Sequence, residues 1–307
     1  MTKHVQITII DYPNALQSAV QGFKELFFLA NRIVIESQLE VQFSVKVIQP
    51  DIDLDGMSQN DIIILPPNLD GDYYYTPQPK LLQYLNEAHQ KGTILCSACA
   101  GAFILAKTGL LNNRVATTHW QLADEFHEAF PKVSLEIESL LINDGDIISA
   151  GGLMSWIDLG LEIVAQFTKP HVMRTLGKFL IVDTGKREQR YYGSFSPKLN
   201  HGNKQILLVQ HFIQANYSKT LNVSVLAALA CMSERTFLRQ FTHATTLKPI
   251  QYIQKIRVQK ACELLESTTH SFERVALNIG YDDVNSFRKV FIKIIGLSPT
   301  AFKERFV

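Results

Sequence analysis

Short apolar runs alternate with amphipathic segments along the first 180 residues or so of the chain. Buried strands are expected at Val5–Ile10, Phe43–Ile48, Ile62–Leu65, Thr93–Cys96 and Ile147–Ala150. Helices are expected at Ala15–Asn31, Pro79–Lys91, Gly101–Thr108, Leu122–Phe130, Met154–Phe167 and His171–Val182. Val115–Thr118 and Ile137–Ile142 predict two further strands. This alternation is typical of an α/β domain with a parallel sheet and helices on both faces.

The pattern changes near residue 183 and becomes helical to the end of the chain. Residues 184–204 are rich in Gly, Ser, Pro, Asn and charge and show no apolar period, which predicts a linker. Helices are then expected at Gln205–Asn216, Val223–Ala230, Glu234–Ala244, Ile250–Glu266, Phe272–Ile279, Val284–Ile295 and Thr300–Phe306. We therefore predict an α/β domain over 1–183, a linker over 184–204 and an all-α domain over 205–307.

An internal repeat with a period of about 50 residues lies in the helical part. The segment beginning at Phe237 aligns with the one beginning at Phe287, and each carries two phenylalanines four residues apart. Leu247-Lys-Pro aligns with Leu297-Ser-Pro in the same register. Each copy predicts a short helix, a tight turn and a second helix, which is the pattern of a helix-turn-helix unit.

The second helix of each unit carries side chains suited to the major groove of double-stranded DNA. The phenylalanines must face the core, so the polar residues between them face outward. Arg pairs with guanine and Asn with adenine, while Ser233 and Asp283 are suited to cap the two helices. The candidate DNA-binding residues are Ser233, Arg235, Leu238, Arg239, Asp283, Val284, Asn285, Arg288 and Lys289.

Charge is distributed unevenly between the two predicted domains, although the whole chain has a net charge of only +1. Residues 201–307 hold 14 Lys and Arg against 7 Asp and Glu, whereas the remainder holds 16 against 22. A basic module joined to an acidic one is typical of a nucleic-acid-binding protein. Hydrophobic content of 46% excludes the disordered class.

The stretch from Gly280 through Phe291, followed by Gly296-Leu-Ser-Pro and Phe302, resembles the signature of the AraC/XylS family of transcription regulators. The resemblance covers residues 205–307 and implies a sequence-specific DNA-binding regulator with promoter DNA and RNA polymerase as partners. Cys231 departs from the pattern, which usually has Gly in the first turn. A Cys at that position is strained if the turn requires positive φ.

A second informative stretch runs from Thr93 to Leu105, where an apolar strand leads through small residues into a helix. Cys99 lies on the turn, which has the form of a nucleophile elbow. The start of a helix is expected to lower the pKa of a thiol, and its free N–H groups favour a carboxylate. His119 is a candidate partner for the thiol.

These residues resemble the class I glutamine amidotransferase-like superfamily with its PfpI-type members, a resemblance that also includes Gly151-Gly152. It implies a flavodoxin-like fold. Joined to an AraC-type end, it matches the GlxA-like subfamily of regulators, which implies control of amino-acid or quaternary-amine catabolism. Ala19 stands where the subfamily usually has Asp, and Glu25 lies about two helical turns further on.

We therefore expect a regulator that is no enzyme and has no catalytic residues, metal or cofactor. A small-molecule effector is expected to bind a pocket formed by Cys99, Ala100, Gly101, His119, Gly151 and Gly152. Two alternatives stay open at this point, a Cys99-dependent amidase or deglycase and a regulator switched by oxidation of Cys96 and Cys99. We also expect a homodimer formed by the N-terminal domain.

The expected location is the cytoplasm. No run of about 18 apolar residues predicts a membrane span, and no signal peptide is recognisable. Four cysteines in so long a chain do not form a disulfide framework, which agrees with a reducing compartment.

Overall fold

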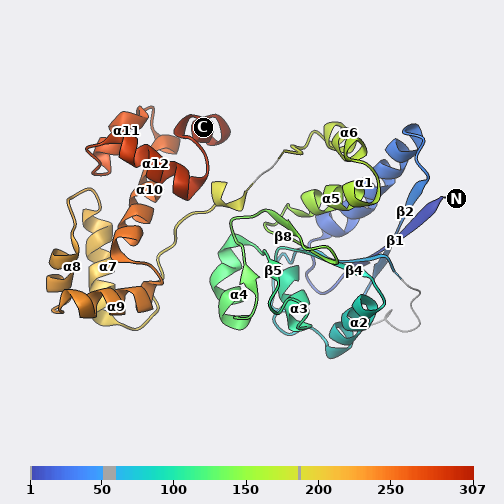
Figure 1. Ribbon diagram of the computed structural model, residues 1–307, viewed down its shortest axis with the longest axis horizontal. Coiled ribbons are helices and arrows are strands. Elements are labelled where there is room, and N and C mark those ends of the chain that lie inside the picture. The colour runs from blue at the N-terminus through green and yellow to red at the C-terminus, as the bar shows by residue number, and fades with distance from the viewer. Residues whose placement is uncertain (1, 51–59, 186–187) are drawn as a thin grey trace. The chain divides into compact units, whose positions relative to one another are not determined.

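The computed structural model describes residues 2–50, 60–185 and 188–307 (Figure 1). Residues 186–187, which belong to the predicted linker, lie outside the described residues. The chain divides into two compact units, Met1–Gln189 and Arg190–Val307. The first unit has one apolar core and the second unit has two.

A six-stranded sheet forms the centre of the first unit. Its strands lie in the order β2-β1-β3-β4-β8-β7, and every neighbouring pair is parallel except β7 and β8. The strands are β1 (Lys3–Ile10), β2 (Val41–Ile48), β3 (Ile62–Leu65), β4 (Ile94–Ala98), β7 (Leu141–Asn143) and β8 (Ile147–Ala150). All residues of β3 and β8 are buried, as expected for strands covered on both faces.

Helices cover both faces of this sheet. Figure 1 shows α1, α5 and α6 on one face and α2 and α3 on the other. The helices are α1 (Gln17–Glu36), α2 (Pro79–Gln90), α3 (Gly101–Lys107), α4 (Ala123–Ala129), α5 (Trp156–Phe167) and α6 (Pro170–Leu180). Between α1 and α5 the Trp156 ring meets Phe23 edge-on with centroids 5.4 Å apart. Gly22 makes room for that ring, since a Cβ there would lie 2.3 Å from it.

The predicted α/β fold with a flavodoxin-like parallel sheet is confirmed, but two of its elements differ from the prediction. The strand expected at Ile137–Ile142 is replaced by β6 (Ser134–Leu135), which pairs with β5 (Val115–Ala116), and by the antiparallel β7. Between them Ser139 forms a bridge to Glu188. This pairing with a distant segment interrupts the apolar run, so local sequence did not reveal it. Helix α1 also extends five residues beyond its predicted end.

The second unit is entirely helical over its described residues apart from loops and turns. Its helices are α7 (Lys204–Asn216), α8 (Val223–Leu229), α9 (Glu234–Thr245), α10 (Pro249–Ser267), α11 (Phe272–Asn278), α12 (Val284–Ile295) and α13 (Pro299–Phe306). Two cores form around α10, which gives Ile253 and Ile256 to one and Ala261 and Leu265 to the other. Each core therefore holds one copy of the sequence repeat.

Candidate DNA interface and candidate effector site

The first helix-turn-helix unit consists of α8 and α9. Phe237 and Phe241 on α9 are completely buried, with ring centroids 5.3 Å apart. Ser233 caps α9 by accepting a hydrogen bond from the Thr236 N–H at 3.3 Å. The turn before the cap holds Cys231 at φ +55°, so the condition under which a Cys is strained at this position is met.

The second unit, α11 and α12, repeats this construction with a different turn. Phe287 and Phe291 are fully buried, and Asp283 caps α12 by accepting from the N–H groups of Asn285 and Ser286. The turn contains Gly280 at φ +86° and is one residue longer than the first turn. A Cβ at Gly280 would lie 2.1 Å from the carbonyl oxygen of Ser218, so only Gly fits there.

Arg257 on α10 links the two helix-turn-helix units, a role that the sequence did not reveal. Its guanidinium donates to the carbonyl oxygens of Tyr217 at 2.7 Å and Lys219 at 2.9 Å, in the loop after α7. The same guanidinium lies over the ring of Tyr281 in the second turn, 5.1 Å from its centroid. Arg257 thereby holds the second turn against the loop after α7.

The predicted DNA-binding residues are placed unequally. Those exposed to solvent are Ser233, Arg235, Leu238, Arg239, Asp283, Asn285 and Lys289. Val284 was predicted to face outward, but it packs partly against the second core because it lies next to the turn. Arg288 is half-buried, since it lies over the Phe272 ring and pairs with Glu273 at 3.4 Å.

Cys99 sits on the predicted sharp turn between β4 and α3, with φ at +53°. Its N–H donates to the Ala150 carbonyl at 2.8 Å, and its carbonyl accepts from the Thr118 hydroxyl at 2.8 Å. The following Gly101 is needed because a Cβ there would lie 2.5 Å from the carbonyl oxygen of Leu65. Strands β3, β4 and β8 thus hold this strained turn from both sides.

The expected activation of the thiol is wrong. Cys99 is only 4% exposed, and this burial raises its pKa to about 11, although the N–H of Ala100 opposes the shift. Desolvation therefore outweighs the helix start. The N–H groups of Ala102 and Phe103 are bonded to the carbonyls of Cys99 and Ala100, so they do not provide the predicted carboxylate site.

His119 and Gly151 are the other predicted pocket residues with clear contacts. His119 caps the 3₁₀-helix η1 (Trp120–Leu122), accepting at Nδ1 from the Gln121 N–H at 3.1 Å, and partial burial lowers its pKa. A Cβ at Gly151 would lie 1.8 Å from Nε2 of Gln189 and 2.6 Å from the Thr118 carbonyl oxygen. Gly152 has φ at +85°.

Gln189 closes the region next to Gly151 and was missed by the sequence analysis. It lies in the predicted linker, yet it is almost fully buried. Its Nε2 donates within 2.8–3.2 Å to the Thr117 hydroxyl and to the carbonyls of Thr118, Ile137 and Ser139. The only signal in the sequence was a lone Gln among charged residues, which does not distinguish a buried amide from a solvated one.

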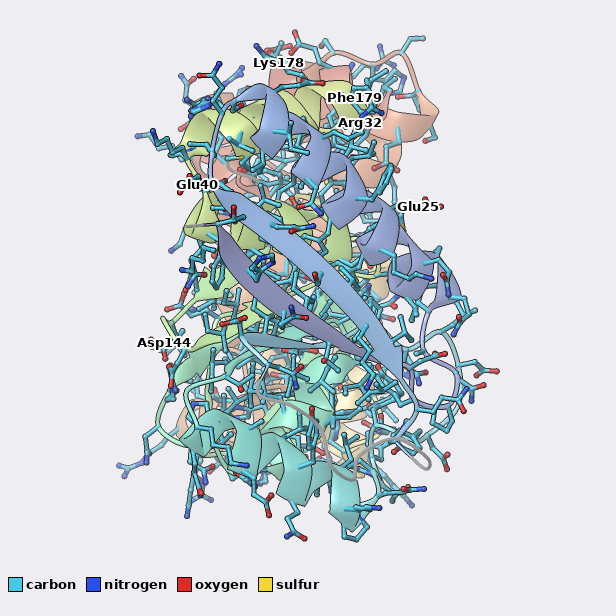
Figure 2. All side chains as sticks on the ribbon, turned by 90° about the vertical axis from the view of Figure 1, so that its right-hand side faces the viewer. Glu25, Arg32, Glu40, Asp144, Lys178 and Phe179 are labelled. Carbon is cyan, nitrogen blue, oxygen red and sulfur yellow. The ribbon has the colours of Figure 1, made fainter. Side chains whose placement is uncertain are left out.

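Position 19 of α1, where the subfamily usually has Asp, holds Ala. Ala19 is fully buried in α1, whereas Glu25 is exposed on the outer side of the same helix (Figure 2).

Tyr74 and Tyr75 pack edge-on against Phe103, with ring centroids 5.2 and 5.4 Å from that of Phe103. These tyrosines therefore contribute to packing.

Within 2–50, 60–185 and 188–307, no group of three or more His, Cys, Asp or Glu side chains could hold a metal ion. Across this described part, no helix is long and apolar enough to cross a membrane.

Comparisons with known proteins match both halves of the chain. A helix-turn-helix domain model matches residues 226–305, and a DJ-1/PfpI family model matches residues 21–166. The HTH-type transcriptional regulator CdhR of Pseudomonas aeruginosa is 27% identical over 261 residues, 82% of this chain and 77% of that protein. The HTH-type transcriptional regulator GlxA of Rhizobium meliloti is 25% identical over 207 residues, which are 67% of this chain and 64% of that protein.

A solved structure supports the fold. The crystal structure of an AraC family transcriptional regulator from Pseudomonas putida matches with a TM-score of 0.50 at 16% identity, over 57% of this chain and 99% of that one. The two family models and the two named regulators confirm the resemblance predicted from the sequence. The chain is an AraC-type helix-turn-helix DNA-binding regulator whose first domain belongs to the DJ-1/PfpI family.

Proposed function

We propose that this regulator binds promoter DNA through α9 and α12 and responds to a small-molecule effector bound by its DJ-1/PfpI domain. The bases are contacted by Arg235, Arg239, Asn285 and Lys289, which are exposed on the two recognition helices. The effector site lies around Cys99–Gly101, His119 and Gly151-Gly152. Residues 1–183, 184–204 and 205–307 act as sensor, linker and DNA-binding domain.

The chain works as a cytoplasmic homodimer formed by the sensor domain and acts on RNA polymerase at its promoters. One chain already carries two helix-turn-helix units, so it can occupy one asymmetric half-site. Occupying two half-sites requires a second chain. The larger sensor domain is the better candidate for this contact.

The state of Cys99 is the observation that favours binding over catalysis. A nucleophilic thiol needs a lowered pKa or an adjacent base. Here burial raises the pKa of Cys99 to about 11, and Ala19 stands in place of the acid expected nearby. Cys96 is fully buried in β4 and its pKa is also raised by burial, which argues against the oxidation switch.

Alkylation rates test this proposal against the enzyme alternative, with an internal control. We expect iodoacetamide at neutral pH to label the exposed Cys231 at least about tenfold faster than Cys99, because the thiolate fraction of Cys99 is small. Peptide mass spectrometry of the full chain gives both rates. Faster labelling of Cys99 than of Cys231 would replace the binding proposal with the enzyme alternative.

Effector binding is tested by filling the site. Free amino acids and quaternary amines serve as the probe panel, and melting of the full chain is the measurement. We expect at least one compound to raise the Tm of wild type and of Cys99→Ser but not of Cys99→Trp. Equal shifts for wild type and Cys99→Trp would place the effector elsewhere.

A further inference from the structure

The buried side chain of Gln189 lies in a ring of oxygen atoms that offers more acceptors than a carboxamide can use. Its Nε2 lies 3.1 Å from the Thr117 hydroxyl and 2.8, 3.2 and 3.1 Å from the carbonyl oxygens of Thr118, Ile137 and Ser139. We call these four oxygens the acceptor ring. A carboxamide nitrogen has only two hydrogens, so it cannot give all four acceptors a well-aligned hydrogen bond.

The other end of the same carboxamide is unsatisfied. Gln189 is 2% exposed, and its Oε1 is buried with no hydrogen-bond partner among the described residues. Turning the amide round would not help, because Oε1 would then face the four acceptors. A primary ammonium would fit the acceptor ring better, since it brings three N–H donors and a positive charge on one nitrogen and leaves no acceptor unpaired.

The acceptor ring adjoins the residues that we assign to the effector site. A Cβ at Gly151 would lie 1.8 Å from Nε2 of Gln189, so this nitrogen lies directly against Gly151. Thr118 supplies one oxygen of the ring, and its hydroxyl donates to the carbonyl of Cys99 at 2.8 Å. A molecule bound against Cys99 and Gly151 would therefore meet the carboxamide of Gln189.

We propose that Gln189 occupies the ammonium-binding part of the effector site and that an effector with a primary ammonium group displaces it. This rests on the effector binding in the proposed function and names the chemical class of the effector. Burying an ammonium is unfavourable in an apolar site, but four oxygens around one nitrogen compensate for the lost water.

Displacement of Gln189 would reach the DNA-binding unit through the chain itself. Gln189 is the last residue of the first unit and begins the 3₁₀-helix η2 (Gln189–Tyr191). The next residues pack within the second unit, where Tyr191 lies under the Arg305 guanidinium at 5.5 Å and the Tyr192 ring meets Phe306 at 5.6 Å. Release of Gln189 therefore lengthens the free segment that joins the sensor to the DNA-binding unit.

Matched pairs of amines test the chemical class in the wild-type chain. Each free amino acid that raises the Tm of the full chain is compared with its N-trimethyl form, which keeps the positive charge but has no N–H. We expect trimethylation to weaken binding by about tenfold or more, because the acceptor ring then receives no hydrogen bond. Equal binding of a trimethyl form would overturn the ammonium assignment.

Removing the carboxamide tests whether Gln189 is the occupant. In Gln189→Ala the acceptor ring is vacated, so we expect methylammonium to bind at least about tenfold more tightly than to wild type and tetramethylammonium to show no gain. Gln210→Ala is the matched control, because Gln210 is equally buried but donates to only two acceptors, the Lys198 carbonyl and the Tyr252 hydroxyl. Equal gains in the two variants, or no gain in Gln189→Ala, would overturn the proposal.

Hydrogen exchange of the peptide 188–192 tests the release. The Gln189 N–H donates to the Glu138 carbonyl at 2.8 Å, so it is protected while the side chain is in place. We expect about tenfold faster exchange in Gln189→Ala and in wild type with any amino acid that raises its Tm. Unchanged exchange in wild type with such a compound would exclude displacement, and this measurement decides even if Gln189→Ala does not fold.

The outcomes separate this inference from the effector proposal on which it rests. Binding of N-trimethyl forms to wild type with unchanged exchange at 188–192 would keep the effector proposal and overturn the role of Gln189. Methylammonium binding to Gln189→Ala, with no shift of the wild-type Tm by any compound of the panel, would support the acceptor ring and overturn the effector proposal.

Discussion

The two helix-turn-helix units share a fold and a core but differ at their turns. In the first unit the two positive-φ positions that flank α9 are Cys231 and Thr246, whereas in the second unit the positions that flank α12 are Gly280 and Gly296. Gly280 lies against the backbone of Ser218, and Cys231 is exposed. The two copies of the repeat therefore share the backbone conformation of the turn. Whether a side chain fits at the positive-φ position depends on how closely another segment of the same chain packs against it.

The recognition helices differ as well. Arg235 and Arg239 on α9 are exposed and have no ion pair within the described residues. Arg288 on α12 is held by Glu273 and by the ring of Phe272. The arginines of α9 can therefore contact guanine directly. Arg288 on α12 must first leave Glu273 and the Phe272 ring before it can contact a base.

Transferring the first turn's residue to the second should have the largest effect. Gly280→Cys forces a Cβ against the Ser218 carbonyl at a positive φ, so we expect a loss of about 3 kcal/mol or more in the free energy of unfolding. Chemical denaturation of the full chain measures this, with attention to the transition of the helical unit. A loss below about 1 kcal/mol would show that the loop after α7 moves aside.

Replacing one arginine on each recognition helix should weaken DNA binding by different amounts for the two units. Arg239→Ala should cost about 1–3 kcal/mol on the best duplex selected from a random pool and much less on random duplex. Arg288→Ala should cost less on the selected duplex, because wild-type Arg288 must first leave Glu273. Fluorescence anisotropy at fixed salt gives both values. The reverse order would contradict the comparison, and equal loss on random duplex would remove Arg239 as a base contact.

Replacing Cys231 by Gly should relieve strain in the first turn only slightly. Positive φ costs a residue with a Cβ about 1–2 kcal/mol, but Gly also loses more backbone entropy on folding. We expect a net gain of roughly 0.5 kcal/mol in the free energy of unfolding. Cys231→Ala keeps the Cβ and is the control, so it should show no such gain.

Acid should weaken the second unit slightly before the first. Hydrogen bonds from the Ser286 hydroxyl and the Asn285 N–H lower the pKa of the Asp283 cap, whereas the first unit is capped by the uncharged Ser233. A lowered folded pKa gives stability that is complete above the ordinary carboxyl pKa of about 3.9 and is lost as pH falls through the folded value.

Amide hydrogen exchange between about pH 6 and pH 3 should detect this difference, after correction for the intrinsic rates. Protection of α12 should fall before that of α9. Asp283→Ser gives both helices the same kind of cap, so the difference should disappear. If α12 of Asp283→Ser still lost protection before α9, Glu273 would be the cause instead of Asp283. The pKa of Glu273 is also lowered, by its own backbone N–H and by Ser271.

Local spacing alone predicted the type of nearly every element. The period of 3.6 in the helical part and the short apolar runs in the first part predicted both folds, because these periods state which side of an element must be buried. Repeated phenylalanines located both recognition helices, and the small residues around Cys99 located the sharp turn. Capping by Ser233 and Asp283 also followed from sequence, since a cap bonds only to its own first turn.

Contacts between distant segments decided the rest. The bridge from Ser139 to Glu188 broke a predicted strand, and Gln189 entered the core from a segment that resembles a linker. Arg257 and Arg288 acquired partners 15 to 40 residues away. The thiol of Cys99 shows the physical reason most clearly. Its turn is encoded locally, but its pKa depends on desolvation by everything packed around it, and only the tertiary structure determines that packing.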